Sequence, residues 1–187
     1  MNKIFKSSVL AGLMIGIGSI SYLANPSIFG CMLFSVGLLA ILDCQLTLFT
    51  GKVPYMKSYK ELPYILTVLA GNTLGCLVLV AFPSDVARNI IIKMLEVPIW
   101  TILIESMICN ILIYVAVESY KKNNILSTIL CVIVFVATGF RHSIATICML
   151  ISARMFDFTI LWYLCVIIVG NGLGGILFHR IRVGCEK

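Results

Sequence analysis

The chain has 187 residues, of which 60% are hydrophobic and only 12% are charged, and its mean hydropathy is +1.07. A water-soluble domain of this length cannot hide that much apolar surface, so the composition indicates an integral membrane protein. About 20 apolar residues cross a hydrocarbon core of ~30 Å, so the chain has room for six spans but not for a soluble domain as well.

We predict six transmembrane spans joined by short loops. They lie near residues 7–24, 28–50, 62–82, 97–117, 125–153 and 158–179. Lys3 and Lys6 precede the first apolar run as they would in a secretory signal, but no small-x-small cleavage site precedes Asn25 and Pro26, which argues against that interpretation. The segment between Pro83 and Pro98 can form a short amphipathic helix on the outer surface.

The net charge of +6 is distributed unequally over the two sides that these spans define. Ten basic residues lie on one side, and three lie on the other. The first group is Lys3, Lys6, Lys52, Lys57, Lys60, Lys121, Lys122, Arg180, Arg182 and Lys187, and the second is Arg88, Lys93 and Arg154. Because basic residues concentrate in cytoplasmic loops, both termini are predicted to be cytoplasmic. The charge is thus an orientation signal with some attraction to membrane lipids, and no nucleic-acid partner is expected.

Two glycine–asparagine motifs lie about half a chain apart. Residues 71–75 read GNTLG in the third span and residues 170–174 read GNGLG in the sixth, a spacing of 99 residues. With three spans in each half, the second half begins on the opposite side of the membrane. We therefore expect one transmembrane domain with inverted repeats over residues 7–82 and 97–179.

The second span of each repeat is interrupted. The apolar runs Ile28–Leu42 and Ile125–Thr138 contain 15 and 14 residues and stop before Asp43 and Gly139. At ~1.5 Å per residue, helices of this length are too short to cross the bilayer. Non-helical backbone at membrane depth persists only where it is buried in protein or lines a watery cavity, so the matching breaks predict a substrate site near the midplane.

Three ionisable residues lie inside apolar sequence: Glu105 in the fourth span, and Arg141 and His142 at the break in the fifth. A charge at this depth costs roughly 2.5–3.5 kcal/mol on insertion scales, so we expect Glu105 and Arg141 to form a pair. Two interpretations stay open. Either the pair is structural and His142 is a satisfied core histidine, or the pair borders a hydrated vestibule and His142 exchanges protons on the solute path.

The cysteines and glycines have packing explanations. All eight cysteines lack a C-x-x-C partner and nearly all lie inside apolar spans, which is typical of small hydrophobic residues and not of a disulfide framework or redox centre. The glycines of the first and sixth spans predict close helix packing. Residues 170–175 do not follow a strand, so a nucleotide-binding loop is not supported.

Several motifs follow one another in a fixed order. They are residues 34–38 (FSVGL), residues 48–51 (LFTG), Cys109-Asn110, residues 139–143 (GFRHS) and the two glycine–asparagine motifs. In order and spacing they resemble the formate/nitrite transporter family over all six spans. The resemblance implies an all-α, aquaporin-like fold with the second and fifth helices broken, a pore in each protomer of a homopentamer, no cofactor, and a prokaryotic cytoplasmic (inner) membrane location.

The resemblance also implies a substrate pathway in which the two loops meet between two narrow apolar slits. Its slit-lining residues would be Phe34, Leu38, Leu48, Phe49 and Phe135, with Thr50 in the first loop, Asn171 beside the outer slit and His142 as the central histidine. Glu105, Arg141 and Thr146 complete the expected pathway.

This chain departs from the family at several of these positions. The family commonly has lysine in place of Glu105 and glutamate in place of Arg141, so the signs are exchanged, and we expect the pair to join the cytoplasmic vestibule to the pore loop. Thr47 occupies the position of an acidic residue in the family, and Thr146 occupies the position of an asparagine. The usual amphipathic helix before the first span is nearly absent.

The first functional interpretation is a channel or transporter for small monovalent anions and their weak acids, such as formate, nitrite and hydrosulfide. A bare anion loses its hydration in a dry slit at a cost of many kcal/mol, whereas a neutral acid loses only a few. The solute could therefore cross as the neutral acid, or pair with a transient imidazolium at His142. The exchanged charges keep an ammonium or small-cation channel as the alternative. No clustered ligands or nucleophiles support a membrane enzyme.

Overall fold

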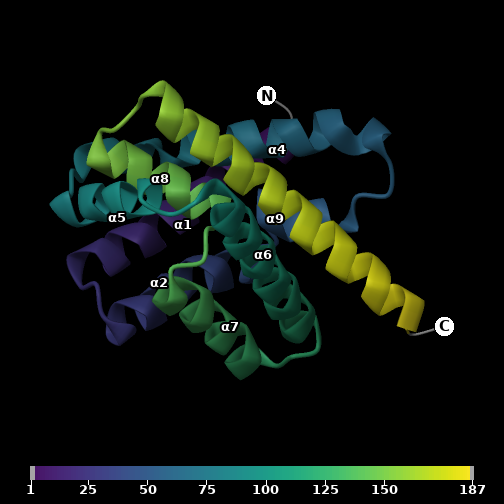
Figure 1. The fold of residues 1–187 in the computed structure, drawn as a ribbon. Helices are drawn as coiled ribbons and strands as arrows, with labels where there is room; N and C mark the ends of the chain where they lie inside the picture. Colours follow the sequence, from purple (N-terminus) through teal and green to yellow (C-terminus); the bar gives the residue numbers. More distant parts are fainter. Residues whose placement is uncertain (1–2, 186–187) are drawn as a thin grey trace.

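Helices make up all the regular secondary structure of residues 3–185, the part of the chain that the computed structural model describes (Figure 1). This confirms the all-α class, while Lys187 of the basic side lies outside the described residues. Four helical segments are long and apolar enough to cross a membrane. They are α1 (Lys3–Ala24), the segment Tyr59–Ala81, α6 (Ile99–Lys121) and α9 (Phe158–Cys185).

The remaining helices are shorter. The segment Tyr59–Ala81 consists of η2 (Tyr59–Glu61), α4 (Leu62–Gly75) and η3 (Cys76–Ala81). A fifth candidate span is the bent pair α7 (Ile125–Thr138) and α8 (Ser143–Ala153), whose axes differ by 49°. The others are α2 (Ile28–Asp43), α3 (Phe49–Lys52), η1 (Val53–Tyr55) and α5 (Asp85–Leu95).

Glycines bring the long helices together in two pairs, α1 with α4 and α6 with α9. A Cβ added to Gly12 would lie 2.0 Å from the backbone oxygen of Asn72, and one added to Gly174 would lie 2.3 Å from that of Met107. Only glycine permits such close backbone approach, so the expected close packing is confirmed. Contacts advance in the same direction along both partners, which makes each pair parallel.

The chain leaves helical geometry at two places inside the molecule. After Asp43 it runs without regular structure to Leu48, and α3 begins at Phe49. After Thr138 it turns at Gly139, whose φ of +75° ends α7 in the left-handed conformation, and helix resumes at Ser143. Nothing lies within 4 Å of a Cβ added to Gly139, so its backbone angle is what favours glycine there.

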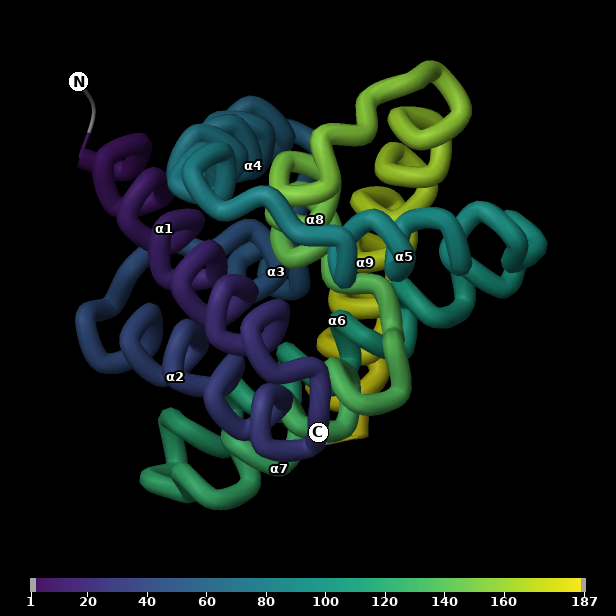
Figure 2. The backbone as a smooth tube through the Cα atoms, turned by 90° about the vertical axis from the view of Figure 1, so that its left-hand side faces the viewer, coloured from purple at the N-terminus to yellow at the C-terminus, as the bar shows by residue number. Residues whose placement is uncertain are grey.

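The short helix expected between Pro83 and Pro98 is present as α5. The Ser84 hydroxyl accepts a hydrogen bond from the Ala87 amide and caps the first turn. Its apolar face, which includes Ile91 and Met94, is buried, and α5 packs against α8 (Figures 1 and 2). One face of α5 is therefore packed against the rest of the protein.

The short helices α3 and α8, which follow the two breaks and are called the half-helices below, lie in the interior. In Figure 2, α3 is in the middle of the view, and it contacts α4, α6, α8 and α9. The outside carries large exposed apolar residues on the long helices, such as Ile17, Leu74, Ile104 and Leu173. An apolar exterior of this kind suits contact with lipid or with neighbouring subunits.

Candidate substrate pathway

Asn72 of α4 holds the first chain break in place. Its side-chain amide donates to the backbone oxygens of Ser8 at 2.7 Å and Thr47 at 3.0 Å. Its side-chain oxygen accepts from the amide of Phe49 at 2.8 Å. Ser8 belongs to α1, whereas Thr47 and Phe49 belong to the break. At membrane depth no bulk water can satisfy the backbone groups of the break, so the buried amide replaces their missing helical hydrogen bonds and ties them to α1.

Asn171 of α9 makes the same set of bonds at the second break. Its amide donates to the backbone oxygens of Ser106 at 2.7 Å and Arg141 at 2.8 Å, and its oxygen accepts from the amide of Ser143 at 2.8 Å. The side chain is fully buried. It therefore braces the loop and does not line the cavity described below, although the resemblance placed it beside the outer slit.

His142 connects the two half-helices. Its Nε2 lies 3.0 Å from the hydroxyl of Thr50 in α3, and its Nδ1 accepts a hydrogen bond from the amide of Ala145 at 3.1 Å, capping α8. Because Nδ1 accepts, the proton of the neutral ring is on Nε2, which donates to Thr50. The ring is only 2% exposed.

Two phenylalanines lie next to this histidine. The ring of Phe135 stacks on His142 with centroids 5.5 Å apart and meets Phe34 edge-on at 5.8 Å. The structure thus brings together two slit residues expected from distant parts of the sequence.

A cavity of about 500 Å³ opens onto these rings. It is bounded mainly by the end of α7, the loop that follows, and the first turns of α8. Its lining residues are Tyr22, Phe34, Ile90, Lys93, Phe135, Val136, Ala137, Thr138, Gly139, Phe140, Arg141, His142, Ala145, Thr146 and Met149.

The charged residues of this lining are both cationic. Arg141 comes from the loop and Lys93 from α5, and no carboxylate among the described residues lines the cavity. The expected ion pair is confirmed, since Nε of Arg141 lies 3.0 Å from Oε2 of Glu105. In the sequence Lys93 is one of only three basic residues on the less basic side, and this scarcity of charge is the signal that could have pointed to it.

The ion pair lies toward the α5 end of the molecule. Glu105 is about 9 Å along the axis from the start of α6, which follows α5 directly. The other end of α6 is joined to the end of α9, where Glu118 and Arg182 are 2.7 Å apart. The pair therefore lies at the end of α6 away from the end of α9. Cytoplasmic termini and a cytoplasmic vestibule at this pair exclude each other, and both stay predictions.

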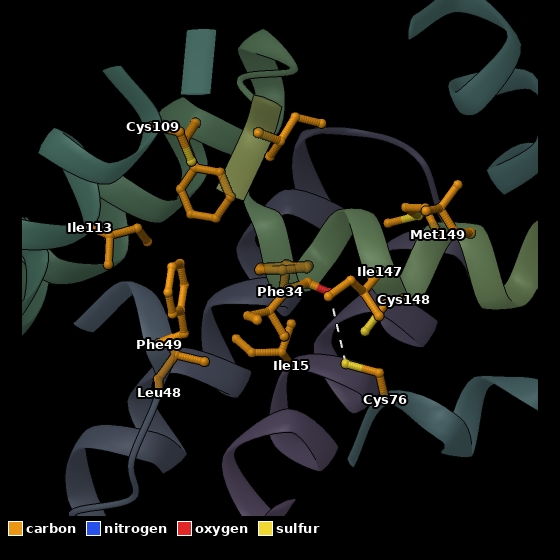
Figure 3. Close-up of a cluster of buried hydrophobic side chains, with 14 of the residues drawn as sticks. Ile15, Phe34, Leu48, Phe49, Cys76, Cys109, Ile113, Ile147, Cys148 and Met149 are labelled. Atoms are coloured by element: carbon orange, nitrogen blue, oxygen red, sulfur yellow. Dashed lines mark hydrogen bonds between the residues drawn. The ribbon is translucent and has the colours of Figure 1, made fainter. Parts of the chain in front are cut away.

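Three of the expected slit residues belong to the hydrophobic core. Leu38, Leu48 and Phe49 are 2–3% exposed. Figure 3 shows Leu48 and Phe49 in the same cluster of buried apolar side chains as Ile113 of α6, a residue that the sequence motifs did not indicate. Thr50 is fully buried, whereas Thr146 lines the cavity.

These features define a class of protein. Two half-helices meet at a histidine, next to a cavity with cationic residues, inside an all-helical membrane protein. This is the architecture of a channel or transporter. The sequence model described as "Formate/nitrite transporter" matches residues 1–182, and the chain belongs to this family. No sequence among functionally curated proteins matches it.

Solved structures have the same fold. A protein described as "FNT family ion channel" superposes with a TM-score of 0.87 at 19% identity, over 98% of this chain and 90% of that one. Another, a "Pentameric formate channel with formate bound", superposes with a TM-score of 0.78 at 21% identity, over 98% of this chain and 94% of that one. Both are channels, and neither is an enzyme by its description.

Proposed function

We propose that this member of the family passes small monovalent anions together with their weak acids, with formate, nitrite and hydrosulfide as the solutes to test. The observation that carries the proposal is the cavity above His142, whose charged lining consists of Lys93 and Arg141. Arg141 is balanced by Glu105, whereas Lys93 adds a positive charge at the entrance. A cationic funnel raises the local concentration of anions.

The same lining argues against the ammonium alternative. That alternative rested on Glu105 as a vestibule carboxylate. Glu105 is paired with Arg141 and is not part of the cavity lining, so a cation entering the cavity meets two positive side chains and no free carboxylate.

The hydrogen bonds of His142 favour passage as the neutral acid. An imidazolium carries protons on both nitrogens, so forming it would break the bond that Nδ1 accepts from Ala145. A neutral ring keeps this cap and still offers its Nε2 proton. The anion gathered by the cavity would therefore take a proton from hydronium of the external solution, releasing water, before it crosses the apolar slits, where a neutral molecule loses less hydration energy.

For the assembly, we propose a homopentamer of six-span protomers in the cytoplasmic membrane with both termini inside. The second and fifth spans are broken, and the halves 7–82 and 97–179 form inverted repeats. The matching bonds of Asn72 and Asn171 support the repeat, and the pentameric description of a structural neighbour supports the oligomer.

Stopped-flow uptake into proteoliposomes tests the function. Formate, nitrite, hydrosulfide and ammonium are compared in the same vesicles at several external pH values. Anion-derived solutes should enter at least about tenfold faster than ammonium, and faster as external pH falls toward the acid range. Ammonium uptake that exceeds formate uptake would overturn the proposal.

A further inference from the structure

The half-helix α3 is too short to be stable through its own helical hydrogen bonds. It has four residues, and a helix of this length is unstable alone because nucleation is costly. Nevertheless it carries Phe49, one of the expected slit residues, and Thr50, the partner of His142. Asn72 fixes its first amide, so the question is what fixes its other end.

The other end continues into η1, which is packed against α9. A Cβ added to Gly175 would lie 2.7 Å from the ring of Pro54, and one added to Gly172 would lie 3.7 Å from Val53. The last residue of η1, Tyr55, donates its hydroxyl to Oε1 of Glu118 in α6 at 2.6 Å.

Glu118 is the centre of a network at this end of the molecule. Besides Tyr55, its carboxylate accepts from Lys121 at 2.7 Å and from Arg182 of α9 at 2.7 Å. Lys121 also donates to the hydroxyl of Tyr55 at 2.9 Å. The Tyr55 ring packs against His179, with centroids 5.0 Å apart. One carboxylate thus ties η1 to both long helices.

The outer half-helix has no need of such a tie. α8 has 11 residues, most of them buried, and α5 packs against it. Its position follows from apolar packing along its length. The four-residue α3, by contrast, is held by Asn72 at one end, and beyond the other end by the packing of η1 against α9 and the Tyr55–Glu118 bond.

We propose that Tyr55 and Glu118 are positioning residues that hold α3 and thereby set the width of the inner slit. Neither residue touches the solute. Their bond keeps α3, with Phe49, packed against α6, so that an acid of formate size passes and an acid with an added methyl group is excluded. This size limit rests on the proposed function, whereas the anchoring of α3 does not.

Tyr55→Phe and Glu118→Gln test the size limit in proteoliposomes. Tyr55→Phe keeps the ring packing and removes only the hydroxyl. In both variants the ratio of acetate uptake to formate uptake should rise roughly tenfold, the factor that corresponds to one hydrogen bond to a charged group. The matched control is Tyr163→Phe, which removes a hydroxyl bond to the backbone oxygen of Val97 in the loop between α5 and α6 and should leave the ratio unchanged.

Hydrogen exchange in detergent tests the anchoring independently of flux. The amides of residues 49–55 should exchange faster in Tyr55→Phe than in the unmodified chain, and Tyr163→Phe should leave them unchanged. Unchanged exchange in Tyr55→Phe overturns the anchoring role. Faster exchange with an unchanged acetate-to-formate ratio overturns the size limit. If the unmodified chain passes no formate, the proposed function fails while the exchange result still decides the anchoring.

Discussion

Asn72 and Asn171 make the same three hydrogen bonds although they are 99 residues apart. Each donates to a backbone oxygen of the parallel neighbouring helix and to one in a chain break, and each accepts from the amide two residues further along that break. The breaks at residues 47–49 and 141–143 are therefore held by one arrangement used twice. Each asparagine supplies one donor and one acceptor to a break that lacks helical hydrogen bonds, and its second donor ties the break to the neighbouring helix.

We expect Asn171→Leu to destabilise the protein strongly. The substitution keeps the approximate volume but leaves the carbonyl of Arg141 and the amide of Ser143 without their partner, at about 1–3 kcal/mol each. The melting temperature of the assembled protein in detergent measures the effect, and exposed Asn89→Leu on α5 is the control. A melting temperature equal to that of the control would show that the break needs no brace.

Lys93→Gln should reduce anion uptake about tenfold at low salt, because it removes the unbalanced positive charge of the cavity. The reduction should shrink as salt increases, since Lys93 is exposed and its field is screened. Arg88→Gln removes a charge from the same helix without touching this cavity and should have little effect. Equal effects of both variants would remove Lys93 from the pathway.

The Glu105–Arg141 pair should show non-additive energetics. Arg141→Glu or Glu105→Lys alone should each cost roughly 2–3 kcal/mol, less than for fully buried pairs because these side chains are 15% and 23% exposed. The double exchange should restore stability while placing a carboxylate in the cavity lining, so formate uptake should fall relative to ammonium uptake. Additive losses in thermal stability would mean that the side chains do not interact.

His142→Asn should preserve assembly, because asparagine can also accept the amide hydrogen bond at the start of α8. The rate of formate uptake should fall, since the Nε2 donor is lost, but the shape of its pH profile should remain that of the unmodified protein. His142→Phe should in addition lose about 1 kcal/mol of stability with the cap. A changed shape of the pH profile in His142→Asn would instead indicate a charged imidazolium in transport.

The sequence by itself determined the all-helical membrane class, because 60% hydrophobic content cannot be buried in a soluble domain of this size. It also indicated where apolar runs stop, near Leu42 and Thr138, and α2 and α7 end at Asp43 and Thr138. The pairing of Glu105 with Arg141 could be predicted because an isolated charge at that depth is too costly.

Only the tertiary structure decided which way the polar side chains point. Hydropathy reports the depth of a residue but not its direction around the helix axis, so Asn171 could not be distinguished from a pore residue, nor Lys93 from a loop charge. The bond from Tyr55 to Glu118 joins residues 63 positions apart. Such contacts depend on how helices pack against one another, and no local pattern in the sequence encodes that distance.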